Sequence, residues 1–339
     1  MKIAFRADTR KISGGGHFFR CLNLAKVLKS KKNKIHFIID KSNNNYKKIL
    51  INNNIKYFEL SKNNNSSSYQ EADLEQTSKI LIKEKTQLLI VDNYNLNKFW
   101  ENKIKEKVEK IFVIDDLDRS HNCHYYLNQN ISAYKEIKKK LPKNCKTFLG
   151  LKYCIINPSL KRKKLKKNKK GIKKLLVFMG MTDSANITLK ILKILSSKKF
   201  SNFKLNIVVG VNNSNLKKII KLSKKRKKTK IYFNLKSMGE VIKKSDLAIS
   251  SGGTFLWECI YLGIPSLVVN YSKKNFKNSD YLRKINCLKV IGSKNISEIQ
   301  LKKNLNRSMS NLNFLNSWQI SKIIDGYGVQ RIKQKVLNF

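Results

Sequence analysis

The sequence has few of the patterns that mark membrane, disulfide-bonded and metal-binding proteins. No run of about 18 consecutive apolar residues is present, so no transmembrane helix is expected. The N-terminus starts with a strand pattern instead of the basic and apolar order of a signal peptide. These features predict a cytoplasmic protein without integral membrane association. The six cysteines form no CxxC pair, which predicts reduced core residues and not disulfides.

Histidine is also scarce, because the chain has only four. The one compact group of metal-ligand types is His121, Cys123 and His124, and its spacing matches no structural zinc site. We therefore expect no bound metal.

Acidic residues are outnumbered by basic ones, 22 to 72, which gives a formal net charge of +50. Such a charge attracts polyanions and suggests a nucleic-acid partner. However, the lysines are spread over the whole chain, and the densest basic run, at 161–174, is typical of a solvated linker. We predict no specific nucleic-acid binding. Nucleic-acid binding remains the non-enzymatic alternative, in which the glycine-rich loops described below are only structural.

At 339 residues the chain exceeds what one hydrophobic core usually organises, so two domains are expected. Short apolar runs alternate with helical segments, which predicts an α/β fold with two doubly wound Rossmann-like sheets and a ligand cleft between them. Buried parallel strands are predicted at 2–8, 34–40, 55–60, 87–94 and 110–116, and then at 173–180, 204–210, 230–235, 246–251 and 265–271. The predicted divisions are an N-terminal domain at 1–158, a basic linker at 159–172, a C-terminal domain at 173–317 and a C-terminal helix at 318–339, interrupted at 325–328.

The stretch GGGH, comprising Gly14, Gly15, Gly16 and His17, lies between the first strand and a helical segment. No GK[ST] follows, so it is not a Walker loop. The glycines permit a tight turn and close approach of a ligand, and the helix start attracts an anion. His17 is expected to project from the helix start, where the helix dipole favours the neutral imidazole of a general base. The alternative is a helix-capping histidine.

A second glycine loop, SSGGTFLWE at 250–258, follows a strand of the C-terminal domain. Gly252 and Gly253 would expose backbone donors to a diphosphate, and Thr254 would add a hydroxyl. Glu258 lies one helical turn further on the same face, where a carboxylate can accept both hydroxyls of a ribose. The alternative is that the glycines serve only packing.

Polar residues at four other positions are also candidates. In GMTD, at 180–183, Gly180 repeats the strand-glycine-helix pattern, and Thr182 or Asp183 either caps the next helix or contacts phosphate. DNY at 92–94 and DD at 115–116 end strands, so Tyr94 is predicted to position a sugar or water. Asp115 or Asp116 is predicted either to hold a polar network or only to form a turn. Asn275 either reaches the cleft through its amide or is an ordinary loop or capping residue.

Together these stretches resemble the UDP-sugar hydrolases of pseudaminic acid biosynthesis, which release UDP from UDP-2,4-diacetamido-2,4,6-trideoxy-β-L-altropyranose. The resemblance rests on FRADTRKISGGGHFFRCLNLAKVL, LLIVDNY, VIDD, YYLNQN, GLKY, GMTD, LAISSGGTFLWECIYLGIPSLVV and DGYGVQRI, which span nearly the whole chain in order. It implies a GT-B fold like that of the glycosyltransferase that adds N-acetylglucosamine to lipid I.

The resemblance also implies a mechanism in which a His17-activated water attacks the anomeric carbon with inversion, without metal or cofactor. Tyr94 and Asn275 would assist His17. The glycine loops and Arg20, which belongs to the GxGHxxRC motif, would contact the UDP-sugar. The alternative is a GT-B glycosyltransferase, but HFFRC replaces the proline-containing segment typical of those enzymes.

Three residues depart from the family pattern. Met181 replaces the second glycine of the GGTD turn, Phe276 replaces the glutamine after the family asparagine, and Asn93 replaces a histidine. These changes concern the sugar contacts more than the UDP site.

Overall fold

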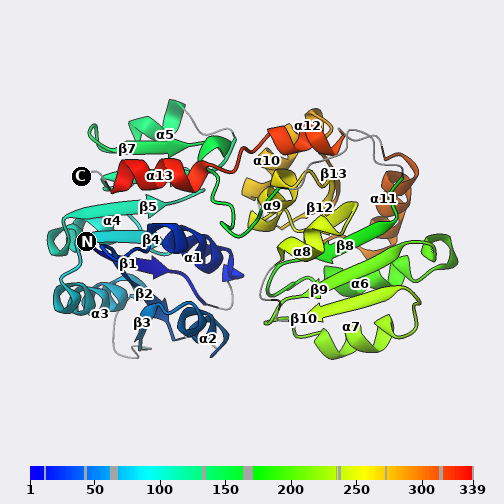
Figure 1. Cartoon of the computed structure of the whole chain (residues 1–339), viewed down its shortest axis with the longest axis horizontal. Helices are drawn as coiled ribbons and strands as arrows, with labels where there is room; N and C mark the ends of the chain where they lie inside the picture. Colours follow the sequence, from blue (N-terminus) through cyan, green and yellow to red (C-terminus); the bar gives the residue numbers. More distant parts are fainter. Residues whose placement is uncertain are drawn as a thin grey trace. The chain divides into compact units, whose positions relative to one another are not determined.

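The computed structural model describes residues 1–10, 13–41, 44–61, 68–131, 135–162, 171–233, 235, 238–271, 273–312 and 316–337, without the side chains of 135 and 273–276. The chain divides into two compact units (Figure 1). The first comprises Met1–Pro158 together with Gly326–Phe339, and the second comprises Ser159–Asp325. Most of the predicted linker falls outside the described residues.

The first unit contains a seven-stranded parallel sheet in the order β3-β2-β1-β4-β5-β6-β7. Its strands are β1 (Lys2–Ala7), β2 (Lys34–Asp40), β3 (Lys56–Leu60), β4 (Leu88–Asp92), β5 (Lys110–Ile114), β6 (Tyr125–Asn128) and β7 (Lys146–Leu149). Its α-helices are α1 (Gly16–Leu28), α2 (Asn44–Asn52), α3 (Tyr69–Glu84), α4 (Lys98–Ile104), α5 (Lys135–Lys139) and α13 (Gly328–Val336). The five predicted strands are present, whereas β6 and β7 were not predicted.

Both faces of this sheet are covered, as expected for a parallel sheet. Alternate residues of β1 enter different cores: Ile3 and Phe5 pack with α1 and α13, whereas Ala4 packs with Trp100 of α4 on the other face. Helix α13 supplies Val329, Ile332 and Val336 to the first core, so the end of the chain returns to the N-terminal unit.

The second unit contains a six-stranded parallel sheet in the order β10-β9-β8-β11-β12-β13. Its strands are β8 (Lys174–Phe178), β9 (Lys204–Val209), β10 (Thr229–Phe233), β11 (Leu247–Ser250), β12 (Ser266–Asn270) and β13 (Leu288–Ser293). Its α-helices are α6 (Ile187–Leu195), α7 (Leu216–Ser223), α8 (Gly239–Lys243), α9 (Thr254–Tyr261), α10 (Lys273–Lys284), α11 (Glu298–Ser310) and α12 (Ser317–Lys322).

Both strand orders begin with the third, second, first and fourth strands of their unit, which is the doubly wound Rossmann pattern. The predicted α/β class with two such sheets is therefore confirmed. The expectation of full burial is wrong for β3 and β10, which are half-buried because each lies at a sheet edge. No helix among the described residues is long and apolar enough to cross a membrane.

Candidate active site

The turn after β1 brings His17 to the carboxyl edge of the first sheet. Gly14 and Gly15 have φ values of 78° and 83°, in the left-handed region that glycine adopts without strain. Helix α1 begins immediately afterwards, with His17 as its second residue. Because β1 lies beside β4, this position places His17 next to the end of β4.

His17 is held by a buried aspartate of β4. Its Nδ1 lies 2.5 Å from Oδ1 of Asp92, which is fully buried. The sequence predicted that the His17 side chain projects from the helix start. In the structure the residue is only 7% exposed, and its ring turns toward this carboxylate. Donation from Nδ1 to Asp92 fixes the tautomer that leaves Nε2 as a proton acceptor. Nε2 has no hydrogen-bond partner among the described residues.

Arg20 binds the same carboxylate from the next turn of α1. Its Nε and Nη2 each lie 2.8 Å from an oxygen of Asp92, and its Nη1 lies 2.6 Å from Oδ2 of Asp116. Burial would raise the pKa of Asp92, but Arg20 and then His17 outweigh it and hold that pKa well below its usual value. All three guanidinium nitrogens thus bind buried carboxylates, which require a cation that neutralises them. The contact of Arg20 with the UDP-sugar stays a prediction.

Tyr94 completes this group. Its hydroxyl donates to Oδ2 of Asp116 at 3.0 Å, and its ring meets the ring of His17 edge-on, with centroids 4.3 Å apart. Burial, and then the charge of Asp116, raise the pKa of Tyr94 well above its usual value, so Tyr94 stays protonated. The structure therefore brings His17, Arg20 and Tyr94 together, and Asp116 takes part in the polar network that its position predicted.

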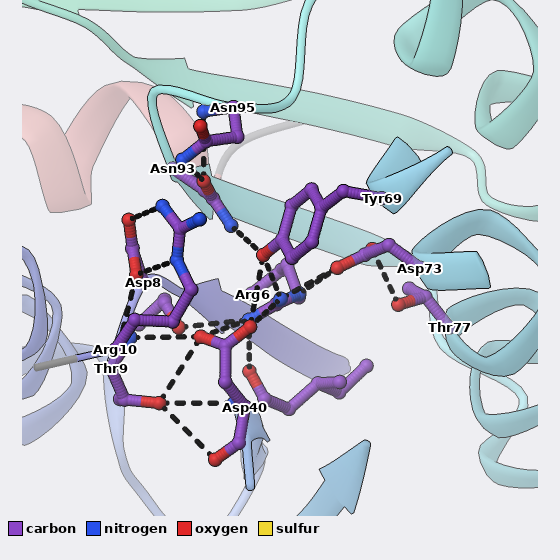
Figure 2. Close-up of polar contacts among 12 residues, drawn as sticks. Arg6, Asp8, Thr9, Arg10, Asp40, Tyr69, Asp73, Thr77, Asn93 and Asn95 are labelled. Atoms are coloured by element: carbon purple, nitrogen blue, oxygen red, sulfur yellow. Dashed lines mark hydrogen bonds and ion pairs between the residues drawn. The ribbon is translucent and has the colours of Figure 1, made fainter. Parts of the chain in front are cut away.

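A second buried network, centred on Arg6 of β1, supports the neighbouring loops (Figure 2). Arg6 is fully buried, and its Nη2 lies 2.6 Å from Asp40 and 2.6 Å from Asp73. Burial would raise the pKa of Asp40, but Arg6 outweighs it and lowers that pKa to about 2. The Tyr69 hydroxyl also joins Arg6 and Asp40, and it accepts a hydrogen bond of 2.9 Å from Nδ2 of Asn93. The residue that follows Asp92 is thereby fixed.

The same network fixes the loop after β1. Oδ2 of Asp40 accepts a hydrogen bond of 2.9 Å from the backbone N–H of Thr9, and the backbone N–H of Asp8 donates to the carbonyl of Asp92 at 3.0 Å. Arg10 pairs with the Asp8 carboxylate at 2.7 Å (Figure 2). Sequence analysis missed this network. Its signals were the arginine within the apolar run KIAFRAD and the aspartate that ends KIHFIID.

In the second unit, two glycine turns follow adjacent strands. Gly180 follows β8 and Gly252 follows β11, with φ values of 87° and 72°. A Cβ at Gly180 would lie 3.8 Å from Oγ of Ser251, so the turns are neighbours. A Cβ at Gly253 would meet nothing within 4 Å, so there is open space before α9 begins at Thr254. The predicted residues Gly180, Gly252, Gly253 and Thr254 therefore share one edge of the sheet.

Glu258 lies on α9, four residues after Thr254 and so on the same helix face. Its side chain is partly exposed, and no residue in the described part of the chain forms a hydrogen bond or ion pair with its carboxylate. Burial raises the pKa of Glu258 to about 7. A partly buried carboxylate without a protein partner, beside glycine turns and a helix start, is typical of a ligand-binding group.

The remaining predicted positions have different outcomes. Asp183 caps α6, because its carboxylate accepts the backbone N–H groups of Ile187 and Thr188 at 2.9 Å each. Thr182 lies partly exposed in the same turn. The backbone of Met181 packs on Gly210, where a Cβ would lie 2.3 Å from the Met181 Cα. The side chain of Asn275 lies outside the described residues, as does that of Phe276.

The three residues considered as a metal cluster have separate partners. His121 lies between two carboxylates, Nδ1 of His124 accepts from the backbone N–H of Ile111 at 3.0 Å, and Sγ of Cys123 lies 3.8 Å from Sγ of Cys145.

The fold is similar to those of solved glycosyltransferases and UDP-GlcNAc 2-epimerases. MurG from Acinetobacter baumannii aligns over 100% of this chain and 99% of its own, with a TM-score of 0.67 and 12% identity. UDP-GlcNAc 2-epimerase from Neisseria meningitidis aligns over 100% of both chains, with a TM-score of 0.59 and 14% identity. Residues 174–325 match the glycosyltransferase family 28 C-terminal domain. The chain therefore has a GT-B fold, and its residues 174–325 are similar to the glycosyltransferase family 28 C-terminal domain.

Two relatives match this GT-B chain in sequence. An uncharacterized protein of Methanocaldococcus jannaschii is 32% identical over 299 residues, which are 84% of this chain and 59% of that protein. The chain thus spans less than two thirds of that relative. The UDP-2,4-diacetamido-2,4,6-trideoxy-beta-L-altropyranose hydrolase of Campylobacter jejuni is 26% identical over 296 residues, which are 84% of this chain and 97% of the hydrolase.

Proposed function

We propose that this protein hydrolyses a UDP-sugar to UDP and a free 2,4-diacetamido-2,4,6-trideoxyhexose. The observation that carries the proposal is the buried His17–Asp92 pair, because a histidine whose Nδ1 is bound to a carboxylate can accept a proton at Nε2. The substrate class is supported by the Campylobacter jejuni relative, a UDP-2,4-diacetamido-2,4,6-trideoxy-beta-L-altropyranose hydrolase with which the chain shares 26% identity.

In this proposal the C-terminal unit binds UDP. The diphosphate contacts the backbone N–H groups at Gly252 and Gly253 and the start of α9, with Thr254 as a further donor. Gly180 and Thr182 contact the phosphates from the neighbouring turn. The unpartnered carboxylate of Glu258 accepts hydrogen bonds from the ribose hydroxyls, as its position on the same face of α9 favours. Gly14, Gly15 and Gly16 give the sugar close access to the backbone.

The chemical step is a single displacement at the anomeric carbon. Nε2 of His17 takes a proton from water, the water oxygen bonds to the anomeric carbon, and the bond from that carbon to the UDP oxygen breaks. The electron pair leaves with UDP, and the configuration inverts. Asp92 stabilises the imidazolium that forms, while the donors around the diphosphate stabilise the leaving anion. A positioned base of this kind contributes about 10²- to 10⁴-fold in rate.

Arg20 has a positioning role in this proposal, besides the substrate contact that its motif predicted. It neutralises Asp92 and Asp116 and so keeps both carboxylates in place. Asp92 then accepts the hydrogen bond from His17, and Asp116 accepts the one from Tyr94. Tyr94 and Asn275 position the water or the sugar. No metal or cofactor takes part in the proposed step.

The experiment is incubation of the purified protein with UDP-2,4-diacetamido-2,4,6-trideoxyhexoses in water enriched in ¹⁸O, without an acceptor. We expect stoichiometric UDP and free sugar, with the heavy oxygen in the sugar. Label in UDP would mean that a phosphorus-oxygen bond breaks, and absence of UDP release would reject hydrolysis.

A GT-B glycosyltransferase is the second candidate, favoured by the match of 174–325 to the family 28 C-terminal domain. A transferase would use the same UDP site but would release UDP only with an acceptor. The same incubation distinguishes the two, because the hydrolase rate is independent of any added acceptor.

A further inference from the structure

His121, outside the proposed reaction, is clamped between two carboxylates. Its Nδ1 lies 2.6 Å from Oε1 of Glu101 and its Nε2 lies 2.7 Å from Oδ2 of Asp115, and the residue is 1% exposed. A carboxylate accepts hydrogen bonds, so both ring nitrogens must carry a proton. The geometry therefore requires an imidazolium that neutralises part of two buried negative charges.

The groups around His121 favour this charged form. Glu101 comes from α4 and also accepts the backbone N–H of Asn122 at 2.6 Å, whereas Asp115 follows β5. The ring of Tyr126 of β6 lies 5.5 Å from the His121 ring between centroids, and the charge of His121 acts to lower the pKa of Cys145. Burial would lower the pKa of His121, but the hydrogen bonds to Asp115 and Glu101 outweigh it and raise the pKa to about 9.

From Asp115 the contacts continue to the proposed active site. The same Oδ2 atom accepts from Nε of Arg119 at 2.8 Å, and Nη1 of Arg119 donates to the backbone carbonyl of Tyr94 at 2.7 Å. The next residue, Asp116, accepts from the Tyr94 hydroxyl at 3.0 Å. Two consecutive aspartates thus hold both ends of Tyr94, Asp115 through Arg119 and Asp116 directly.

We propose that His121 is a positioning residue: it holds Asp115, which orients Arg119, which fixes Tyr94 against the ring of His17. The kinetic part of this inference depends on the hydrolase function proposed above. The positional part is independent of it.

Two variants distinguish the hydrogen bond of His121 to Asp115 from its hydrogen bond to Glu101. In His121→Gln the side-chain amide nitrogen can take the place of Nε2 and keep the donor to Asp115, whereas in His121→Asn it can take the place of Nδ1 and keep only the donor to Glu101. Each variant loses the imidazolium charge and one of the two buried hydrogen bonds. We expect His121→Asn to lower kcat about 10- to 100-fold, and His121→Gln at most about 5-fold, because small misplacements near the chemistry are costly.

The dissociation constant of UDP, measured by calorimetry, should be the same in both variants and the wild type. Equal kcat values for the two variants, or a lower kcat for His121→Gln, would overturn the proposal. Arg119→Lys should lower kcat as much as His121→Asn does. The double variant with both substitutions should have no lower kcat than either single variant, because both act through Tyr94. Additive losses would also overturn it.

A readout without substrate comes from ¹⁵N NMR of the imidazoles, which is tractable with four histidines. We expect both nitrogens of His121 to be protonated at pH 8 and to lose a proton only near pH 9. The resonances of His17, whose ring lies 4.3 Å from that of Tyr94, should shift in His121→Asn and not in His121→Gln. A His121 that titrates below pH 7 would overturn the inference. If no UDP-sugar is hydrolysed by the wild type, the proposed function fails while this measurement still decides the position of His121.

Discussion

Nδ1 of His17 and Oδ1 of Asp92 lie 2.5 Å apart, and Arg20 binds both oxygens of the same carboxylate. One buried negative charge is thus shared between an arginine that is always charged and a histidine that need not be. The arginine neutralises the resting carboxylate, and the carboxylate is then available to stabilise the imidazolium when His17 accepts a proton. This division of roles makes the two partners of Asp92 distinguishable by mutation.

Replacement of the base should separate catalysis from binding. We expect His17→Asn to abolish measurable turnover, because no other group in the proposed step accepts the proton. The UDP dissociation constant should stay within a few-fold, because His17 is not proposed as a nucleotide ligand. Steady-state kinetics and calorimetric titration with UDP check the two quantities, and parallel loss of both would instead indicate a structural role.

Replacement of the orienting carboxylate should be nearly as damaging. Asp92→Asn keeps the volume, but its amide can present a donor to Nδ1, which would favour the tautomer with a protonated Nε2. We expect kcat to fall about 10²- to 10⁴-fold, in line with orienting aspartates of other histidine bases. Asp280→Asn, at an exposed pair with Arg283, is the matched control and should leave kcat unchanged. A fall of less than about 5-fold for Asp92→Asn would remove Asp92 from the mechanism.

Most of the architecture could be predicted because buried parallel strands leave continuous apolar runs in the sequence. The missed strands lack that signal. β6 and β7 have four residues each, and β13 combines buried and partly exposed positions beside a register shift in β12. Length and apolar character do not distinguish such segments from loops.

The glycine turns of the candidate site could be predicted because the backbone there needs a particular residue. Gly15 and Gly252 were found because a left-handed turn after a strand selects glycine. The partner of His17 was missed because Asp92 is 75 residues away and becomes a neighbour only through the strand order that puts β4 beside β1. The contacts of Arg6 and His121 have the same origin.

Removal of the Glu258 carboxylate should weaken nucleotide binding and leave the chemistry intact. We expect Glu258→Ala to raise the dissociation constant of UDP about 10-fold or more, because hydrogen bonds to a charged group contribute about 1.5–3 kcal/mol. kcat at saturating substrate should change by less than about 3-fold. Calorimetric titration with UDP and with uracil-containing analogues that lack the ribose hydroxyls provides the comparison. An unchanged UDP affinity would remove Glu258 from the ribose assignment.

The raised pKa of Glu258 also predicts how UDP affinity depends on pH. A carboxylate accepts both ribose hydroxyls only when it is deprotonated, so UDP should bind more weakly as the pH falls below about 7. Phosphate protonation acts in the same range, with a pKa of about 6, so the informative quantity is the ratio of wild-type to Glu258→Gln affinity. That ratio should decrease as the pH is lowered from 8 to 5.5. A ratio independent of pH would contradict the raised pKa of Glu258.

The Glu258 carboxyl should also make the free energy of unfolding depend on pH, in the opposite direction to UDP affinity. Its pKa is raised from 4.5 to about 7 in the folded chain, so between these values the folded state binds more protons than the unfolded state. The free energy of unfolding therefore decreases as the pH rises from about 4.5 to 7 and stays lower above that. Glu258→Gln removes this cost, so it should be more stable than the wild type at pH 8, by roughly 1 to 3 kcal/mol, and similar to it near pH 4.5. Urea unfolding at both pH values measures the difference. Glu240→Gln, which replaces an exposed glutamate of α8, is the control and should show no such difference between the two pH values. Equal stability of Glu258→Gln and the wild type at pH 8 would mean that Glu258 is solvated like a surface residue.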